Sequence, residues 1–323
     1  MNQKENPCDS FLKWALPKMQ LRPEGYRKVR GQVCKRIRKR IKELGLQSIG
    51  DYRTLLEENP GEWKVLDEMT RITISRFFRD KKAWEELGDR LLPEVIRESA
   101  VDELPTERKS AGDELPPESI QNSAGDTLPP DKIRESEDGR LLPEFSKRSD
   151  GERPFLRCWS AGCASGEEPY SLSILWREKL LPLFPDADME IIATDADPGM
   201  LDRAREGCYT RGSFREMPWN WMEKAFYRKG HTYCIRKPYS EPVSFYLQDI
   251  RKEMPEGEFD LVFCKNLAAM YFSRELATII FNRISERMRK GAYLVLGNHE
   301  EIDIEGIRDI ELFDRGMNMY RKK

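Results

Sequence analysis

The stretch RCWSAGCASGEEPYSLSILW, residues 157–176, places two glycines between an apolar run typical of a β-strand and an apolar run typical of an α-helix. In an open α/β sheet, ligands bind beyond the carboxyl ends of the strands, next to such a turn. Gly162 and Gly166 would let the backbone approach a ligand closely, because glycine has no side chain. We therefore expect a binding site at this turn.

The acidic residues after the glycines indicate which ligand the turn accepts. Glu167 and Glu168 begin the helix, and Pro169 follows in its first turn. Acidic side chains are favourable at the positive end of a helix, but two carboxylates would repel the phosphates that a bare glycine turn binds. We therefore expect S-adenosylmethionine, a nucleoside with a sulfonium and an ammonium group and no phosphate, in preference to NAD or ATP.

Residues 151–323 alternate between strand-like and helix-like runs. The strand-like runs are FLRCWS, MEIIATD, VSFYL, FDLVFC and AYLVLG. Helical patterns such as PGMLDRAREG follow most of them, so we predict an α/β domain with a doubly wound, mainly parallel sheet. MNMYRK, near the end of the sequence, would form a final edge strand.

The second of these strands ends at an acidic pair. Asp195 lies at its carboxyl end, where an acid typically binds ribose hydroxyls. Asp197 precedes Pro198, and a capping role at the start of the next helix explains it sufficiently. We assign ligand binding to Asp195 and capping to Asp197.

Residues 1–87 lack strand alternation and predict a small all-helical domain. The segment 26–46 carries nine Lys/Arg and one Glu. Its apolar residues recur at helical spacing: Val29, Val33, Ile37, Ile41 and Leu44. One face of this helix is therefore apolar and the rest is basic. Two interpretations stay open, a solvated surface helix and a docking surface for an acidic partner.

Residues 88–150 contain the related fragments GDRLLPE, VDELPTE, GDELPPE, GDTLPPD and DGRLLPE. Each has too few apolar residues to stack as a solenoid repeat. Seven prolines and an acidic excess, 16 acidic against nine basic residues, favour an expanded and largely disordered acidic linker. The first and last fragments, which contain LLPE, could be ordered helix ends.

Composition excludes several classes of function. A net charge of −2 predicts no whole-protein attraction to nucleic acid or membrane. No apolar run approaches the ~18 residues of a membrane span, and no signal peptide is recognisable. The seven cysteines lack metal-knuckle spacing and lie mostly in apolar runs, which favours reduced, buried thiols in a cytoplasmic protein. With only His231 and His299, a His-rich metal site or a Ser-His-Asp triad is not expected, and we predict no metal.

Several stretches in order resemble the chemotaxis receptor methyltransferases of the CheR type. They are TRITISRFFRD at 70–80, WSAGCASGEEPYSL, IIATDADPGMLDRAREGCY, FDLVFCKN and YLVLGNHE. The basic helix is similar to the family's receptor-facing N-terminal helix. The resemblance covers nearly everything except the repeats. It implies a Rossmann-like, S-adenosylmethionine-dependent enzyme that methylates glutamate side chains on the cytoplasmic helices of receptors.

The resemblance also implies roles for residues near the cofactor. Glu168, in preference to Glu167, would hold the methionine end, and Asp195 would hold the ribose. The residues implied to reach the cofactor from the N-terminal domain are Thr73, Ser75 and Arg79. Gly162 and Gly166 would form the turn.

The remaining implied roles belong to the second half of the chain. Asp249 and Ile250 occupy the place where the family usually has an Asn-Leu pair near the adenine. Lys265 and Asn266 stand where the family has Arg-Asn, and Tyr271 falls where a tyrosine faces the reaction centre.

The sequence departs from the family pattern at several of these positions. Thr73 replaces Asn, Ser75 replaces Thr, and Lys265 replaces Arg, which keeps the charge and loses the planar fork. NLAAMYF is one residue longer than usual, which leaves the alignment of Tyr271 open, and GNHE replaces GHSE. The segment from Thr210 to Tyr239, where the family has a small receptor-contacting β-subdomain, is short. These changes affect substrate contacts more than the glycine turn.

The expected reaction is methyl transfer to a glutamate carboxylate. A carboxylate is ionised at neutral pH, so the site needs no general base, and orientation can supply ~7–11 kcal/mol. Arg79 would steer the carboxylate and Tyr271 would help to position it. Two alternatives stay open: a methyltransferase for another protein or a small acid, and a catalytically inactive S-adenosylmethionine-binding docking module.

Overall fold

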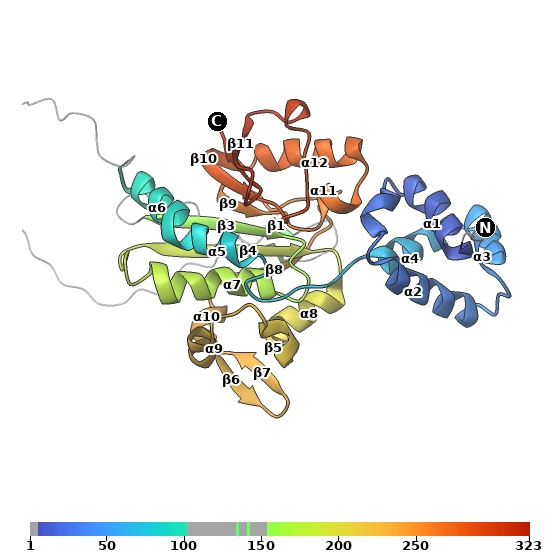
Figure 1. Cartoon of the computed structure of the whole chain (residues 1–323), viewed down its shortest axis with the longest axis horizontal. Helices are drawn as coiled ribbons and strands as arrows, with labels where there is room; N and C mark the ends of the chain where they lie inside the picture. The colour runs from blue at the N-terminus through green and yellow to red at the C-terminus, as the bar shows by residue number, and fades with distance from the viewer. Residues whose placement is uncertain (1–5, 102–133, 136–140, 143–153) are drawn as a thin grey trace, which may run out of the picture.

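The computed structural model describes residues 6–101, 134–135, 141–142 and 154–323. Figure 1 shows a helical domain beside a sheet domain, with a small antiparallel sheet attached to the second. Most of the predicted linker 88–150 lies outside the described residues, apart from its start and two short strands that pair with each other. These strands are β1 (Arg134–Glu135) and β2 (Leu141–Leu142).

The described part of the helical domain, from residue 6 to residue 70, contains four α-helices and one short 3-10 helix. They are α1 (Pro7–Lys18), η1 (Pro23–Tyr26), α2 (Arg30–Glu43), α3 (Ile49–Glu58) and α4 (Pro60–Thr70). Helix α2 is the predicted basic helix, and Val33 and Ile37 on its apolar face are fully buried. It ends before Gly45, whose φ of +69° is the left-handed conformation that favours glycine after a helix.

The predicted parallel sheet is present. Five strands run parallel: β3 (Phe155–Ala161), β4 (Asp188–Asp195), β8 (Val243–Leu247), β9 (Phe259–Phe263) and β10 (Met288–Val295). With two antiparallel strands, β11 (Ile310–Asp314) and β12 (Met319–Lys322), the order is β11-β12-β10-β9-β3-β4-β8. The order reverses at β3, so a crevice is expected at the carboxyl ends of β3 and its neighbours. MNMYRK does form a strand, but the prediction that it is the edge was wrong, because β11 pairs outside it.

Helices cover both faces of the sheet. They include α7 (Glu167–Leu175), η3 (Trp176–Leu180), α8 (Pro198–Glu206), α11 (Ala268–Tyr271), α12 (Arg274–Ser285) and η5 (Ile304–Gly306). Alternate residues of β3 divide between two cores: Trp159 packs in the core that α12 joins, and Cys158 packs in the core that α7 joins. This alternation is what a strand with helices on both faces requires.

Helical structure continues past the predicted boundary between residues 87 and 88. The elements there are α5 (Lys81–Glu86), η2 (Leu87–Leu91) and α6 (Leu92–Val101). Leu87, Leu91 and Leu92 are fully buried, and they belong to the same core as Leu156 on β3. The first LLPE fragment is therefore part of a helix on the sheet domain, because its leucines have a core to enter.

The segment from Thr210 to Tyr239 contributes two strands to the small sheet, with short helices before and after them. Its elements are η4 (Arg211–Phe214), α9 (Trp219–Ala225), β6 (Phe226–Lys229), β7 (Thr232–Ile235) and α10 (Lys237–Ser240). Strand β7 pairs antiparallel with β6 and with β5 (Cys208–Tyr209), and β6 is an edge strand.

The expectation of reduced cysteines was wrong for four of them. Cys8 and Cys34 form a disulfide between α1 and α2, and Cys208 and Cys234 form one between β5 and β7. The second pair faces directly across the two strands, a proximity that sequence spacing does not indicate. The remaining cysteines are free and buried: Cys158, Cys163 and Cys264.

Candidate active site

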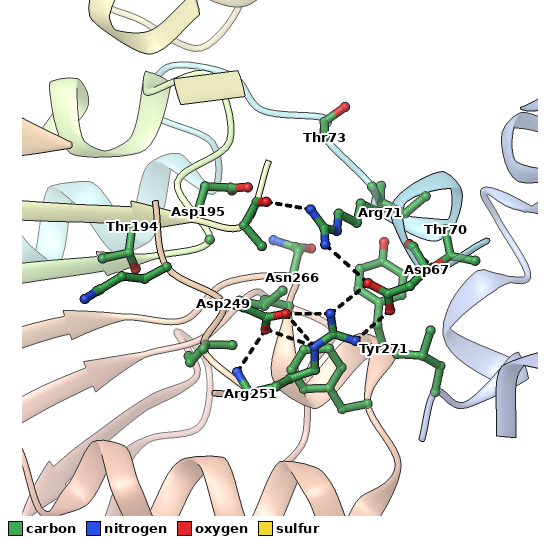
Figure 2. Close-up of a pocket in the computed structure, with 18 of the residues that line it drawn as sticks. Asp67, Thr70, Arg71, Thr73, Thr194, Asp195, Asp249, Arg251, Asn266 and Tyr271 are labelled. Carbon is green, nitrogen blue, oxygen red and sulfur yellow. Dashed lines mark hydrogen bonds and ion pairs between the residues drawn. The ribbon is translucent and has the colours of Figure 1, made fainter. Parts of the chain in front are cut away.

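A cleft lies at the carboxyl ends of β3, β4, β8 and β9, next to the segment 71–80 that leaves the helical domain. It has two lobes. The first lobe, drawn in Figure 2, contains Asp195 and Asp249. The second lobe contains Glu168 and Lys265. Residues that line both lobes are Ile72, Gly162, Asn266 and Tyr271.

The cleft brings together all but one of the predicted site residues. Those that line it are Thr73, Ser75, Arg79, Gly162, Glu168, Asp195, Asp249, Ile250, Lys265, Asn266 and Tyr271. The exception is Gly166, which precedes α7 with a φ of +89°. A Cβ there would lie 2.9 Å from the Cβ of Ala204. Gly166 therefore permits close packing against α8, which explains the glycine without a ligand, and contact between Gly166 and the ligand stays a prediction.

Gly162 has a different reason to be glycine. Its φ is +72°, and a Cβ there would lie 2.7 Å from Cδ2 of Leu267. Its amide donates to the carbonyl of Thr194 at the end of β4. The turn is thus held between two other segments of the cleft wall, and only a residue without a side chain fits.

Asp195 organises the turn as well as lining the first lobe. Its Oδ2 accepts a bond of 2.8 Å from the amide of Ala164, and its Oδ1 accepts one of 2.9 Å from the amide of Asp197. Burial raises the pKa of this carboxyl, and the two amide bonds oppose the rise. Each carboxylate oxygen can accept a further bond. Asp197 caps α8 through the amides of Gly199 and Met200, as predicted.

The two glutamates after the turn diverge. Glu168 faces the second lobe, where its Oε1 accepts a bond of 2.8 Å from Ser160 Oγ. Burial raises the pKa of Glu168, against the nearby charge of Lys265, whose Nζ lies 4.0 Å from Oε2. Glu167 is buried, accepts bonds from Ser165 and Ser213, and lines neither lobe. Of the two glutamates, only Glu168 lines the cleft, and its role as the ligand-facing acid stays a prediction.

Lys265 joins the segment 71–80 to the sheet. Its Nζ lies 3.1 Å from Oδ2 of Asp80 and donates a bond of 3.1 Å to the carbonyl of Arg79. Its side chain is only 4% exposed. Phe78 and Asp80, on either side of Arg79, both have positive φ, which is a strained conformation for residues other than glycine. Lys265 therefore helps to fix the shape in which Arg79 is presented.

Asn266 and Tyr271 lie where the two lobes meet, and Arg79 reaches Asn266 from the second lobe. Nη2 of Arg79 donates to Oδ1 of Asn266 at 3.1 Å. Asn266 has a φ of +55°. The Tyr271 ring packs 5.0 Å from that of Tyr26 in the helical domain, and burial raises the pKa of its hydroxyl. A guanidinium from the segment 71–80 thus lies beside an amide and a phenol from the segment 266–271.

An ion network that sequence reasoning missed closes the far side of the first lobe (Figure 2). Arg251 contacts both Asp67 of α4 and Asp249, and Arg71 contacts Asp67 and donates to the carbonyl of Ala196 at 2.5 Å. Burial acts to raise the pKa of Asp67, but its bonds to the two arginines outweigh burial, and the pKa is lowered. The sequence signal that could have revealed this network is a pair of arginines, Arg71 and Arg251, each two residues from a motif residue, Thr73 or Asp249.

In the ranges that the structure describes, no group of three or more His, Cys, Asp or Glu side chains could hold a metal ion. Among the same residues, no helix is both long enough and apolar enough to cross a membrane.

Known proteins share much of this sequence. The family described as CheR methyltransferase, SAM binding domain, matches residues 135–312, more than half of the chain. The chemotaxis protein methyltransferase of Listeria monocytogenes is 34% identical over 241 residues, which cover 74% of this chain and 70% of that protein. Chemotaxis protein methyltransferase 1 of Pseudomonas aeruginosa is 30% identical over 280 residues, which cover 84% of this chain and 82% of that one.

Similarity to solved structures is weaker. An S-adenosylmethionine-dependent methyltransferase from Clostridium acetobutylicum aligns with 43% of this chain and 41% of its own at 15% identity, with a TM-score of 0.27. A likeness at this level does not bear on function.

Proposed function

The chain belongs to the CheR methyltransferase family and is an S-adenosylmethionine-dependent methyltransferase of the chemotaxis type; from this premise we propose that it methylates glutamate carboxylates of a chemoreceptor-like protein. The observation that carries the proposal is the meeting of Arg79, Asn266 and Tyr271 at the junction of the two lobes. An arginine beside the methyl donor suits an anionic acceptor.

The residues of the cleft fit this cofactor. Glu168 would hold the ammonium of its methionine end in the second lobe, and Asp195 would hold the ribose in the first. Thr73 and Asp249, which also line the first lobe, would face the nucleoside. The carboxylates disfavour a ligand with phosphates, which has no positive group to offer them.

When bound, S-adenosylmethionine supplies a methyl group on a positively charged sulfur. A glutamate carboxylate is ionised at neutral pH, so the site needs no base to activate it. Arg79 would orient the carboxylate, and Tyr271 would close the junction against water. Because an anion meets a cation, excluding water favours the step. The main contribution would be orientation, which can supply ~7–11 kcal/mol.

The basic face of α2 would dock the substrate. Lys35, Arg38, Lys39 and Lys42 are exposed. Arg40, on the same helix, is not available to a partner protein. Its Nε and Nη2 donate bonds of 2.9 Å and 2.8 Å to the carboxylate of Glu62 within the helical domain. The exposed residues form a positive surface, which would attract the acidic helices of a receptor.

The test is to incubate the protein with S-adenosylmethionine labelled on its methyl group and with a cell extract that contains chemoreceptors. Label that appears on a receptor-sized protein and is released by mild base identifies a methyl ester of a carboxyl group. Label that is stable to base points to methylation at nitrogen or carbon, and therefore to a different acceptor. Binding of S-adenosylhomocysteine without any transfer of label would favour the docking module.

A further inference from the structure

Glu300 lies outside the cleft lining, yet it contacts the turn that carries two of its residues. The side chain follows β10 and is 3% exposed. Its Oε2 accepts bonds from the amides of Asn266 at 2.5 Å and Gly297 at 2.6 Å, and its Oε1 accepts one from the amide of Leu267 at 3.2 Å. Burying an unpaired carboxylate would be costly in free energy. The three amide donors offset that cost.

The turn that Glu300 holds needs support. Asn266 has a φ of +55°, an uncommon value for a residue other than glycine. Its side chain accepts the bond from Arg79, and the amide of Tyr271 donates to the carbonyl of Leu267 one turn later. A change in the backbone conformation of Asn266 would therefore displace both the Asn266 side chain, which Arg79 contacts, and Tyr271.

Glu300 is itself fixed from the opposite side. The side-chain amide of Asn318 donates to the carbonyls of Gly297 and Glu300, and the Tyr320 hydroxyl donates to Asn318 Oδ1. A Cβ on Gly297 would lie 2.8 Å from Nδ2 of Asn266 and from Oε2 of Glu300. The backbone at Gly297 and Glu300 is thus held by Asn318, which precedes β12, and the close approach of the carboxylate requires glycine at position 297.

We propose that Glu300 is a positioning residue of the methyl-transfer site, whose ionised carboxylate holds the turn at Asn266 and Leu267 in the shape that presents Asn266 to Arg79 and Tyr271 to the junction. The proposal rests on the cofactor site and not on the identity of the methyl acceptor. A protonated Glu300 carboxyl would carry an O–H donor on one of the oxygens that now accept bonds from backbone amides. A donor facing a donor cannot form a hydrogen bond, so the turn would loosen when Glu300 is protonated.

The surroundings place this change near neutral pH. Burial raises the pKa of Glu300 to about 7, and the amides of Asn266, Gly297 and Leu267 and the charge of Lys265 oppose that rise. The other titratable groups that its charge affects are Cys264, Tyr271 and Tyr320. In each of them the pKa is raised, so they are uncharged at neutral pH. Affinity for the cofactor should therefore increase as pH rises through about 7.

The experiment is calorimetric titration with S-adenosylhomocysteine between pH 6 and pH 8, which needs no acceptor. In the wild type we expect affinity to rise with pH. In Glu300→Gln we expect the rise to disappear and the affinity at pH 8 to fall about tenfold, as when a charge-assisted hydrogen bond is lost. Glu300→Asp keeps the charge with a shorter reach, so it should retain the pH dependence at lower affinity. Thermal unfolding checks that each variant is folded.

Two controls isolate the carboxylate. Glu301→Gln changes the exposed acid next to it and should leave both affinity and pH dependence as in the wild type. Because His299 is an exposed titratable neighbour, the wild-type titration is repeated with His299→Asn, which should keep the pH dependence. Equal affinity and equal pH dependence in Glu300→Gln and wild type would overturn the inference alone. A wild type that does not bind S-adenosylhomocysteine would overturn the cofactor site as well.

Discussion

Arg251 of the sheet domain forms a two-point ion pair with Asp67 of the helical domain: Nη1 lies 2.6 Å from Oδ1, and Nη2 lies 2.8 Å from Oδ2. The same guanidinium contacts Asp249. Since Asp67 and Asp249 both line the first lobe, the pair ties the two domains together at the edge of the proposed cofactor site. The helical domain therefore contributes to the wall of the proposed cofactor site.

Asp67→Asn should weaken cofactor binding, because it removes one charge from this tie. We expect affinity for S-adenosylhomocysteine to fall about tenfold, which corresponds to about 1.4 kcal/mol. Titration calorimetry measures the change. Glu68→Gln, at the exposed neighbouring position, is the matched control and should bind as the wild type does. Unchanged binding by Asp67→Asn would show that the tie does not support the site.

The same network predicts how stability depends on pH. The pKa values of Asp67 and Asp249 are lowered, since bonds to Arg251 outweigh burial. Such groups stabilise the fold above their unfolded pKa of about 4, and this contribution is lost as pH falls through their native values. Unfolding in urea at pH 3 and pH 6 should show a smaller difference in Asp67→Asn than in the wild type. An identical difference in the two proteins would contradict this assignment.

Arg79→Ala should separate catalysis from cofactor binding. Loss of the guanidinium removes the group proposed to orient the acceptor, so turnover should fall about a hundredfold. Affinity for S-adenosylhomocysteine should change far less, because Glu168 and Asp195 remain. Lys82→Ala removes an exposed charge from the same region and should retain full turnover. Equal loss of turnover and affinity in Arg79→Ala would mean that Arg79 serves the cofactor and not the acceptor.

Gly25→Ala should disturb the contact between the domains. A Cβ at Gly25 would lie 2.0 Å from the carbonyl oxygen of Met270, next to Tyr271. Relief of such overlap typically costs about 1–3 kcal/mol, which thermal unfolding would detect. At Gly31, on the exposed side of α2, a Cβ meets nothing within 4 Å. Gly31→Ala should therefore be neutral or stabilising by up to about 1 kcal/mol. The reverse order of stabilities would contradict the observed contact.

The two disulfides should contribute to stability. Each closes a loop with a sequence separation of 26 residues, for which loss of the bond typically costs about 3 kcal/mol. Dithiothreitol should therefore lower the unfolding temperature, and alkylation of the unreduced, denatured protein should label only Cys158, Cys163 and Cys264. Labelling of all cysteines without reductant would restore the prediction of a fully reduced chain.

The parts of the fold that the sequence predicted depend on local pattern. The strand from Phe155 to Ala161, the glycine turn and the helix from Glu167 are consecutive, so apolar period and turn residues define them. The position of Asp195 at the cleft was predicted from its place at the end of the next strand. Gly166 shows the limit of such reasoning, because the sequence does not distinguish a glycine required for packing from a glycine required by a ligand.

What the sequence did not predict depends on distant partners. Asp67 and Arg251 are 184 residues apart, and Glu300 meets Asn266 across 34 residues. No periodicity connects such positions, and tertiary structure alone brings them together. The disulfide between Cys208 and Cys234 was missed for the same reason, since it depends on the register of β5 and β7.

The central claim is that a cleft rimmed by carboxylates selects a positively charged nucleoside, with Glu168 holding its methionine end. Competitive titration with S-adenosylmethionine, ATP and NAD tests it most directly. We expect S-adenosylmethionine to bind, Glu168→Gln to weaken that binding strongly, and neither phosphorylated nucleotide to compete. Displacement of S-adenosylmethionine by ATP or NAD at similar concentrations, or full binding by Glu168→Gln, would contradict the claim.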